Sequence, residues 1–258
     1  MCWALPSDLE FLGNELQFPH FNGYVPCWNC SASRVPGTPC PLTDVRLNAA
    51  WKGTLVDHLD GARRPVSQHP LILHLKGFTR WHVPGDLQHS GDLGVLLWLE
   101  GAVLDELLYD GPLSGNPAQR CAQLFSIIQT AYGSNAREGI NASTRLSALS
   151  PNMFHRPGKF ACLAAKAAEA RTLLPCLLRV CRELHTGSDR DEHRDRALKS
   201  LTNMYAVFKV GDIVLADDEA DEAVRCYEIF LFHYNTLLHL SLARNDKNYN
   251  LTTKAHYP

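Results

Sequence analysis

The chain has 258 residues, of which 45% are hydrophobic and 20% are charged, a composition typical of a folded globular protein. Its 25 Lys and Arg residues nearly balance its 27 Asp and Glu residues, which gives a net charge of -2. This balance excludes a positive field over the whole surface, so any binding of nucleic acid must come from a local patch. No apolar run is long enough to span a membrane, and Asp8 and Glu10 stand where a secretory signal needs a basic start.

Residues 1–88 form the first predicted domain, an irregular region in which frequent prolines prevent long helices. Short strand-like runs at Cys2–Leu5 and Leu71–Leu75 and a short helix at Leu9–Leu16 are the regular elements expected there.

Residues 89–258 form the second predicted domain, which is expected to be helical almost throughout. The predicted fold class is therefore mainly α: a helical bundle that follows a short irregular, strand-containing region. Pro175 is expected to kink the third helix, and the first helix has so little polar surface that we expect it to be buried on most sides. Hydrophobic periodicity predicts five helices, at about 91–108, 118–132, 159–184, 190–209 and 218–242.

The last predicted helix begins with an acidic cluster, Asp217–Glu222. Carboxylates at a helix start cap free N–H groups and oppose the helix dipole, so we assign this cluster no chemistry. The candidate packing residues of this helix are Ala223, Tyr227, Phe230, Leu231, Leu238 and Leu242.

Cysteine occurs nine times, an odd number without an export signal, which argues against a disulfide framework and for a reducing, intracellular compartment. Cys162, Cys176 and Cys181 fall in an apolar stretch and are predicted to be reduced core residues.

Cys27-Trp28-Asn29-Cys30 is the clearest local motif. Two thiolates at this spacing can hold one zinc ion at a turn, but a structural site needs four ligands, and the candidates for the others are His20, Cys40, His69 or another histidine. Unpaired core cysteines and a redox pair are the alternatives, although a redox pair opens a helix after a strand and Pro26 precedes this one.

Three acidic positions are candidates for chemistry. Asp86 and His89 stand three residues apart at the mouth of the first long helix, and Glu169 lies beside the apolar stripe of the third. Each also has a simpler structural explanation: Asp86 as a helix cap beside a hydrogen-bonded histidine, Glu169 as a solvated partner of Lys166, and Asp8 as a cap or strand-end acid.

The order of these motifs along the chain resembles cut-and-paste transposases of the CACTA (En/Spm-like) type. The sequence that carries the resemblance is Asp8, Cys27-x-x-Cys30, Asp86-x-x-His89 leading into Leu93-Gly94, Lys166-Ala-x-Glu169-x-Arg171, and Lys254-Ala255-His256. The family has a ribonuclease H-like core with an Asp-Asp-Glu triad and a helical insertion before the Glu. The resemblance thus implies that residues 1–88 are a remnant of that α/β core.

By this resemblance Asp8 matches the second catalytic Asp and Glu169 the catalytic Glu, while Asp86 stands in the Asp-x-x-His motif. Cys27, Cys30 and His89 match the family's Cys/His elements. The implied chemistry is DNA cleavage and strand transfer with two Mg²⁺ or Mn²⁺ ions held by carboxylates. The implied partner is transposon-end DNA, and the implied location is intracellular and includes the nucleus.

The sequence departs from the family pattern in several places. Only seven residues precede Asp8, so no first catalytic Asp is present upstream; Gln88 replaces a usual Met and Ala170 a usual Trp. We therefore expect a transposase-derived carboxyl-terminal fragment with little or no cleavage activity. The alternative is a non-enzymatic helical interaction module with a structural zinc site.

Overall fold

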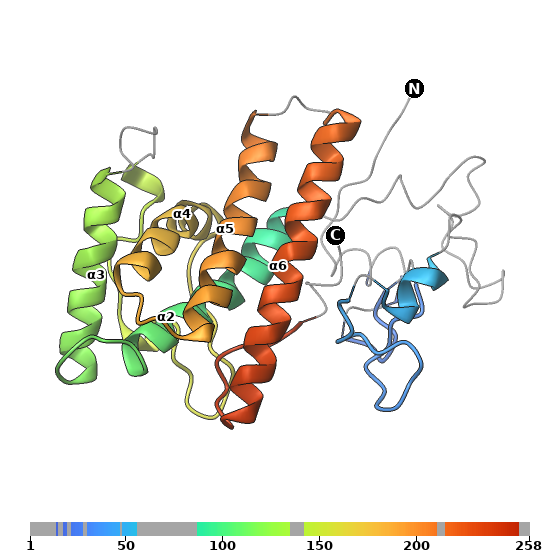
Figure 1. Ribbon diagram of the computed structural model, residues 1–258, viewed down its shortest axis with the longest axis horizontal. Coiled ribbons are helices and arrows are strands. Elements are labelled where there is room, and N and C mark those ends of the chain that lie inside the picture. The colour runs from blue at the N-terminus through green and yellow to red at the C-terminus, as the bar shows by residue number, and fades with distance from the viewer. Residues whose placement is uncertain are drawn as a thin grey trace. The chain divides into compact units, whose positions relative to one another are not determined.

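The computed structural model describes residues 14, 18–19, 22–27, 30–46, 48–55, 87–134, 142–210 and 215–252. Long helices make up most of the described chain (Figure 1). The β-structure found among the described residues is an isolated bridge between Ser33 and Pro41. The predicted mainly α fold is confirmed. The predicted strands 2–5 and 71–75, and most of the predicted helix 9–16, lie outside the described residues.

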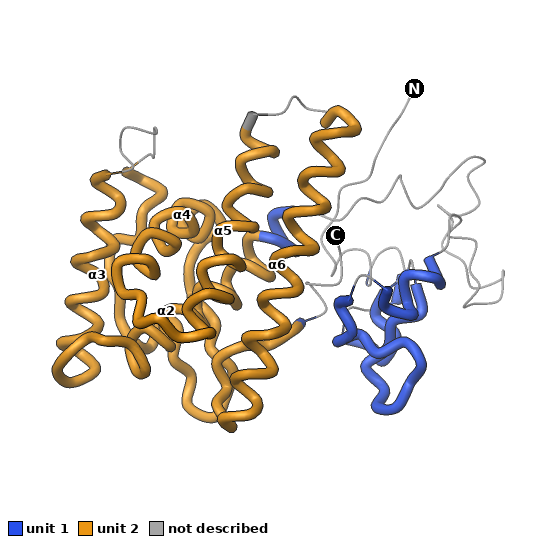
Figure 2. The backbone as a smooth tube through the Cα atoms, in the orientation of Figure 1, with its two compact units in different colours: residues 1–91, 252–258 blue, residues 92–251 orange. Residues whose placement is uncertain are grey.

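The chain divides into two compact units, residues 1–91 with 252–258 and residues 92–251 (Figure 2). In the described part of the first unit, a loop structure buries Cys27, Cys30 and Leu42 and ends in the short 3-10 helix η1 (Ala50–Thr54). The second unit is a bundle of five α-helices, α2–α6. Within the described ranges, no helix is long and apolar enough to cross a membrane.

The centre of the second unit is helix α2 (Leu97–Tyr109), which continues from the π-helix η5 (Gln88–Leu96). Each residue from Leu99 to Leu108 is buried, which confirms the prediction of a helix enclosed on most sides. Three of the buried side chains are acidic, Glu100, Asp105 and Glu106. A protein interior accepts such groups only when they are neutral or paired with a countercharge.

Three helices begin and end close to their predicted positions: α3 (Pro117–Ser134), α5 (Asp189–Val210) and α6 (Asp217–Ala243). Helices α5 and α6 lie side by side along most of their lengths (Figure 1). The prediction that Leu242 packs in the core is wrong, because its side chain is 55% exposed near the end of α6.

The predicted start of the third helix at residue 159 is wrong, because α4 runs from Ala167 to Glu183 and continues through Pro175. Residues 161–164 instead use their backbone to join other segments. The Ala161 N–H donates to Lys247 O at 3.1 Å, and the Leu163 N–H to Leu97 O at 2.9 Å. These bonds replace the intrahelical ones that the apolar spacing favoured. Cys162, Cys176 and Cys181 are buried free thiols, as predicted.

The helix ends follow local capping chemistry. Ser188 and Asp191 form a reciprocal capping box at α5: Ser188 N donates to Asp191 Oδ2, and Asp191 N to Ser188 Oγ, both at 3.2 Å. At α6 the first turn carries Asp217, Asp218 and Glu219, and Glu219 accepts the Ala216 N–H at 2.9 Å, as the capping interpretation predicts. Helix α6 ends in a Schellman motif, in which Asn245 has a left-handed backbone with φ of 57° and Asp246 N donates to Ser241 O.

At Gly101, the backbone of Cys162 and Leu163 packs directly against α2. Substitution of this glycine therefore tests the packing. A Cβ atom there would lie 2.5 Å from Cys162 Cα and 2.6 Å from Cys162 C, so backbone would have to move. We expect Gly101→Ala to lower the free energy of unfolding by about 2–3 kcal/mol, as overpacking does. Gly133→Ala in α3 is the control, because a Cβ there meets nothing within 4 Å, and it should be neutral or stabilise by up to about 1 kcal/mol. Urea unfolding measures both; equal effects would contradict the close packing of α2.

Candidate functional site

The sequence-predicted site residues are only partly within the described chain. Asp8 and Asp86 lie outside it. Glu169 lies in the first turn of α4, where its Oε2 accepts the Lys166 N–H at 2.9 Å. The pKa of Tyr132 is raised, mainly by burial and further by the Glu100 and Glu169 carboxylates, so both acids lie near this ring. Glu169 therefore caps α4.

The Cys-x-x-Cys motif lies in the first unit, and both of its sulfur-bearing side chains are buried. The Ala32 N–H donates to Cys30 Sγ at 3.4 Å. Among the described residues, no group of three or more His, Cys, Asp or Glu side chains is arranged to hold a metal ion, so Cys40 does not complete a site there. His89 lies half-buried in η5, and the other proposed ligands, His20 and His69, lie outside the described chain.

Asp92 links two of the sequence motifs that the resemblance uses. It lies three residues beyond His89, is fully buried, and forms an ion pair with Arg171 of the Lys166–Arg171 motif. The Tyr205 hydroxyl donates to Asp92 Oδ1 at 2.6 Å. The start of the long helical segment and the Glu-bearing helix α4 are thus fixed to each other through one carboxylate.

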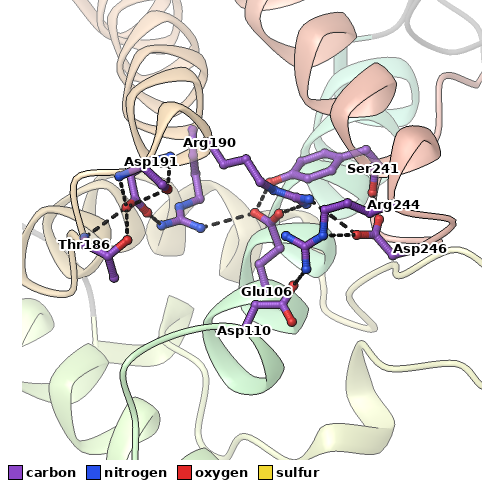
Figure 3. A network of polar contacts seen from close by, with 11 residues as sticks. Glu106, Asp110, Thr186, Arg190, Asp191, Ser241, Arg244 and Asp246 are labelled. Carbon is purple, nitrogen blue, oxygen red and sulfur yellow. Dashed lines mark hydrogen bonds and ion pairs between the residues drawn. The ribbon is translucent and has the colours of Figure 1, made fainter.

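Glu106 is the centre of a larger buried network (Figure 3). Its carboxylate pairs with Arg190, accepts Arg194 NH1 at 3.2 Å, and accepts the Tyr249 hydroxyl at 2.6 Å. These partners come from α5 and from the segment after α6, far from Glu106 in the sequence. Three charged hydrogen bonds from two other elements therefore position the middle of α2.

Asp191 extends this network to the start of α5. Burial alone would raise its pKa, but hydrogen bonds from Thr186 and the charge of Arg194 outweigh burial and lower the pKa of Asp191 well below its ordinary value. Asp191 Oδ2 accepts the Thr186 hydroxyl at 2.6 Å and the Ser188 hydroxyl at 2.9 Å. Asp191 thus remains ionised, and it orients Arg194 toward Glu106.

A pocket of about 370 Å³ opens beside this network, between the end of α2, the 155–161 segment and the turn after α6. On its wall, His155 Nδ1 lies 2.7 Å from Asp105 Oδ1, and the His155 ring stacks against Tyr109 with centroids 4.7 Å apart. Burial raises the pKa of Asp105, against the opposing effect of the His155 hydrogen bond. Sequence inspection missed this pair because its members are fifty residues apart in the chain.

Glu100 is the acid of α2 with no visible countercharge. It is fully buried, and neither carboxylate oxygen has a hydrogen-bond partner among the residues that the structure describes. Burial, and secondarily the charge of Asp92, raise the pKa of Glu100 well above its ordinary value. Its stable form in the folded protein is the neutral acid.

The comparisons with known proteins found no match: no family model, no curated protein and no solved structure is similar to this chain.

Glu100→Gln is expected to stabilise the protein, and to do so increasingly as the pH rises. The folded-state pKa of Glu100 lies above its unfolded value of about 4.3, so wild-type stability is lost as the pH rises above that value. Glutamine cannot titrate, and we expect a gain of about 1 kcal/mol or more at pH 7 that vanishes near pH 4. Urea unfolding across this pH range measures the gain. Glu183→Gln at the exposed end of α4 is the control, and a gain independent of pH would contradict the assignment.

Proposed function

We propose that the chain derives from a CACTA-type transposase, with an ancestral role in metal-dependent DNA cleavage and strand transfer. The ordered motifs support this proposal, and so does one geometric observation. The Asp92–Arg171 ion pair joins the segment that follows Asp86-x-x-His89 to the helix that carries Glu169. A mainly helical unit is also compatible with the helical insertion that precedes the Glu in that family.

Asp8, Asp86 and Glu169 are the residues that would hold the divalent ions. When bound, such ions activate the attacking oxygen and stabilise the leaving oxygen of a phosphodiester. Glu169 is suited to this role by its carboxylate, but its hydrogen bond to Lys166 N occupies one oxygen. Since the first Asp of the triad has no match among these 258 residues, we expect weak ion binding and little cleavage.

Manganese binding followed by electron paramagnetic resonance tests this proposal. We expect Glu169→Gln and Asp86→Asn each to weaken Mn²⁺ binding at least about tenfold, because hard cations bind carboxylates far better than amides. Glutamine retains an oxygen that accepts the Lys166 N–H, so α4 keeps its cap. Glu183→Gln, on the same helix but exposed, is the control.

Unchanged Mn²⁺ affinity in both variants would contradict the proposed site. In the same samples, a labelled terminal-repeat duplex should remain largely uncut, and robust cleavage would contradict the expected inactivity.

A second candidate function, a non-enzymatic interaction module with a structural zinc site, is favoured by two observations. Cys30 Sγ accepts a backbone N–H within a buried pair of cysteines, and α6 exposes large apolar side chains, with Phe232 63% and Val224 53% accessible. An exposed apolar helix face is typical of a surface that binds another protein.

Metal analysis of the purified chain tests the zinc site. We expect about one equivalent of zinc, lost together with the fold of the first unit in Cys27→Ser, because a structural ion contributes its binding energy to folding. Cys226→Ser in α6 is the matched control and should retain the metal. Zinc absent from the wild-type chain, or retained in Cys27→Ser, would contradict this function.

A further inference from the structure

The pocket beside the Glu106 network has a rim that carries more positive than negative charge. Arg156, Lys159 and Lys247 line it from exposed positions. Lys247 Nζ donates to the backbone Gly158 O at 2.9 Å, a neutral acceptor that leaves its charge uncompensated. These three cations come from two segments that are distant in the sequence and meet at one pocket.

The acidic side chains of the pocket are already neutralised by other partners. Asp110 Oδ2 lies 2.8 Å from Arg244 NH2, and Asp246 Oδ2 lies 3.3 Å from Arg190 NH1. Asp105 is paired with His155. The remaining acids of the network, Glu106 and Asp191, are buried behind the pocket.

A charge count decides the sign of the region. The network in Figure 3 holds four acids, Glu106, Asp110, Asp191 and Asp246, and three arginines, Arg190, Arg194 and Arg244. Asp105 on the pocket wall adds a fifth negative charge, so these groups sum to about minus two. The three rim cations exceed this deficit, so the pocket region as a whole carries a net positive charge.

The pocket is also held in shape before any ligand arrives. The Ala161 N–H donates to Lys247 O at 3.1 Å, which ties the two segments of the rim together. Asp105 engages His155 Nδ1, and this fixes the ring so that Nε2 is the nitrogen available to a ligand. Because this backbone is already fixed, the rim does not have to be ordered when a ligand binds.

We propose that this pocket binds a phosphate group of duplex DNA through Arg156, Lys159 and Lys247. Phosphate is the ligand chemistry that a small cluster of Lys and Arg fits. The choice of DNA as its source rests on the proposed function. The pocket would then be the local patch that DNA binding requires in a chain with a net charge of -2.

Binding of a short fluorescent duplex by the full 258-residue chain, measured over a salt series, tests the proposal. We expect Arg156→Glu/Lys159→Glu to weaken binding at least about tenfold and to lower the salt slope by about two, because each neutralised phosphate contributes about 0.9. The control is Arg179→Glu/Lys199→Glu, which makes the same change of charge at exposed positions on α4 and α5. It should bind like the wild type.

Three results would overturn the proposal. The first is an equal loss in both double variants, which would assign the effect to net charge. The second is tighter binding of inorganic phosphate than of the duplex at matched ionic strength, which would assign the pocket to free phosphate. The third is no duplex binding by the wild-type chain at low salt. None of these results bears on Mn²⁺ binding by Glu169 and Asp86. The proposed function and the proposed phosphate site can therefore be rejected independently of each other.

Discussion

The burial of acidic side chains on α2 is the constraint on which the rest of the second unit depends. An isolated carboxylate inside a protein is costly, so each acid of this helix needs a partner or must be neutral. Glu106 forms ion pairs with Arg190 and Arg194 and accepts the Tyr249 hydroxyl. Asp105 is paired with His155, and Glu100 is a neutral acid. The positions of α5, of the 155–161 segment and of the chain after α6 follow from these requirements as much as from apolar packing.

The same constraint gives the second unit its two polar regions. In the middle of η5, Asp92 pairs with Arg171 and so connects the first helical segment to α4, near Glu100 and Glu169. At the end of α2, the Glu106 network supports the pocket whose rim carries Arg156 and Lys159. The first region includes Glu169, one of the residues to which the transposase resemblance assigns metal chemistry, and the second is the one that we infer to contact phosphate. Both are built from charges that serve the fold.

The sequence predicted the helices well and the polar partners poorly. Apolar periodicity located α3, α5 and α6, because each has one buried face, and the lack of polar surface correctly indicated an enclosed α2. It extended α4 too far, because Leu163 fits the helical spacing although its N–H group bonds to the distant Leu97 carbonyl. Glu100, Asp105 and Glu106 within an apolar run were a signal that buried countercharges exist. Spacing along one chain, however, does not identify Arg190, His155 or Tyr249 as their partners. Asp8 and Asp86 fall outside the described residues, so their part in the predicted triad stays a prediction.

The long-range partners of Glu106 also bear on how the chain folds. Helices α5 and α6 are neighbours in sequence and can associate early, because only a short loop has to close between them. The contacts of Glu106 with Arg190, Arg194 and Tyr249 span 84, 88 and 143 residues. Non-local contacts of this kind slow folding, and α2 cannot enter the interior at low cost until its countercharges are in place. We therefore expect α2 to insert late in folding, into an α5–α6 pair that has already formed.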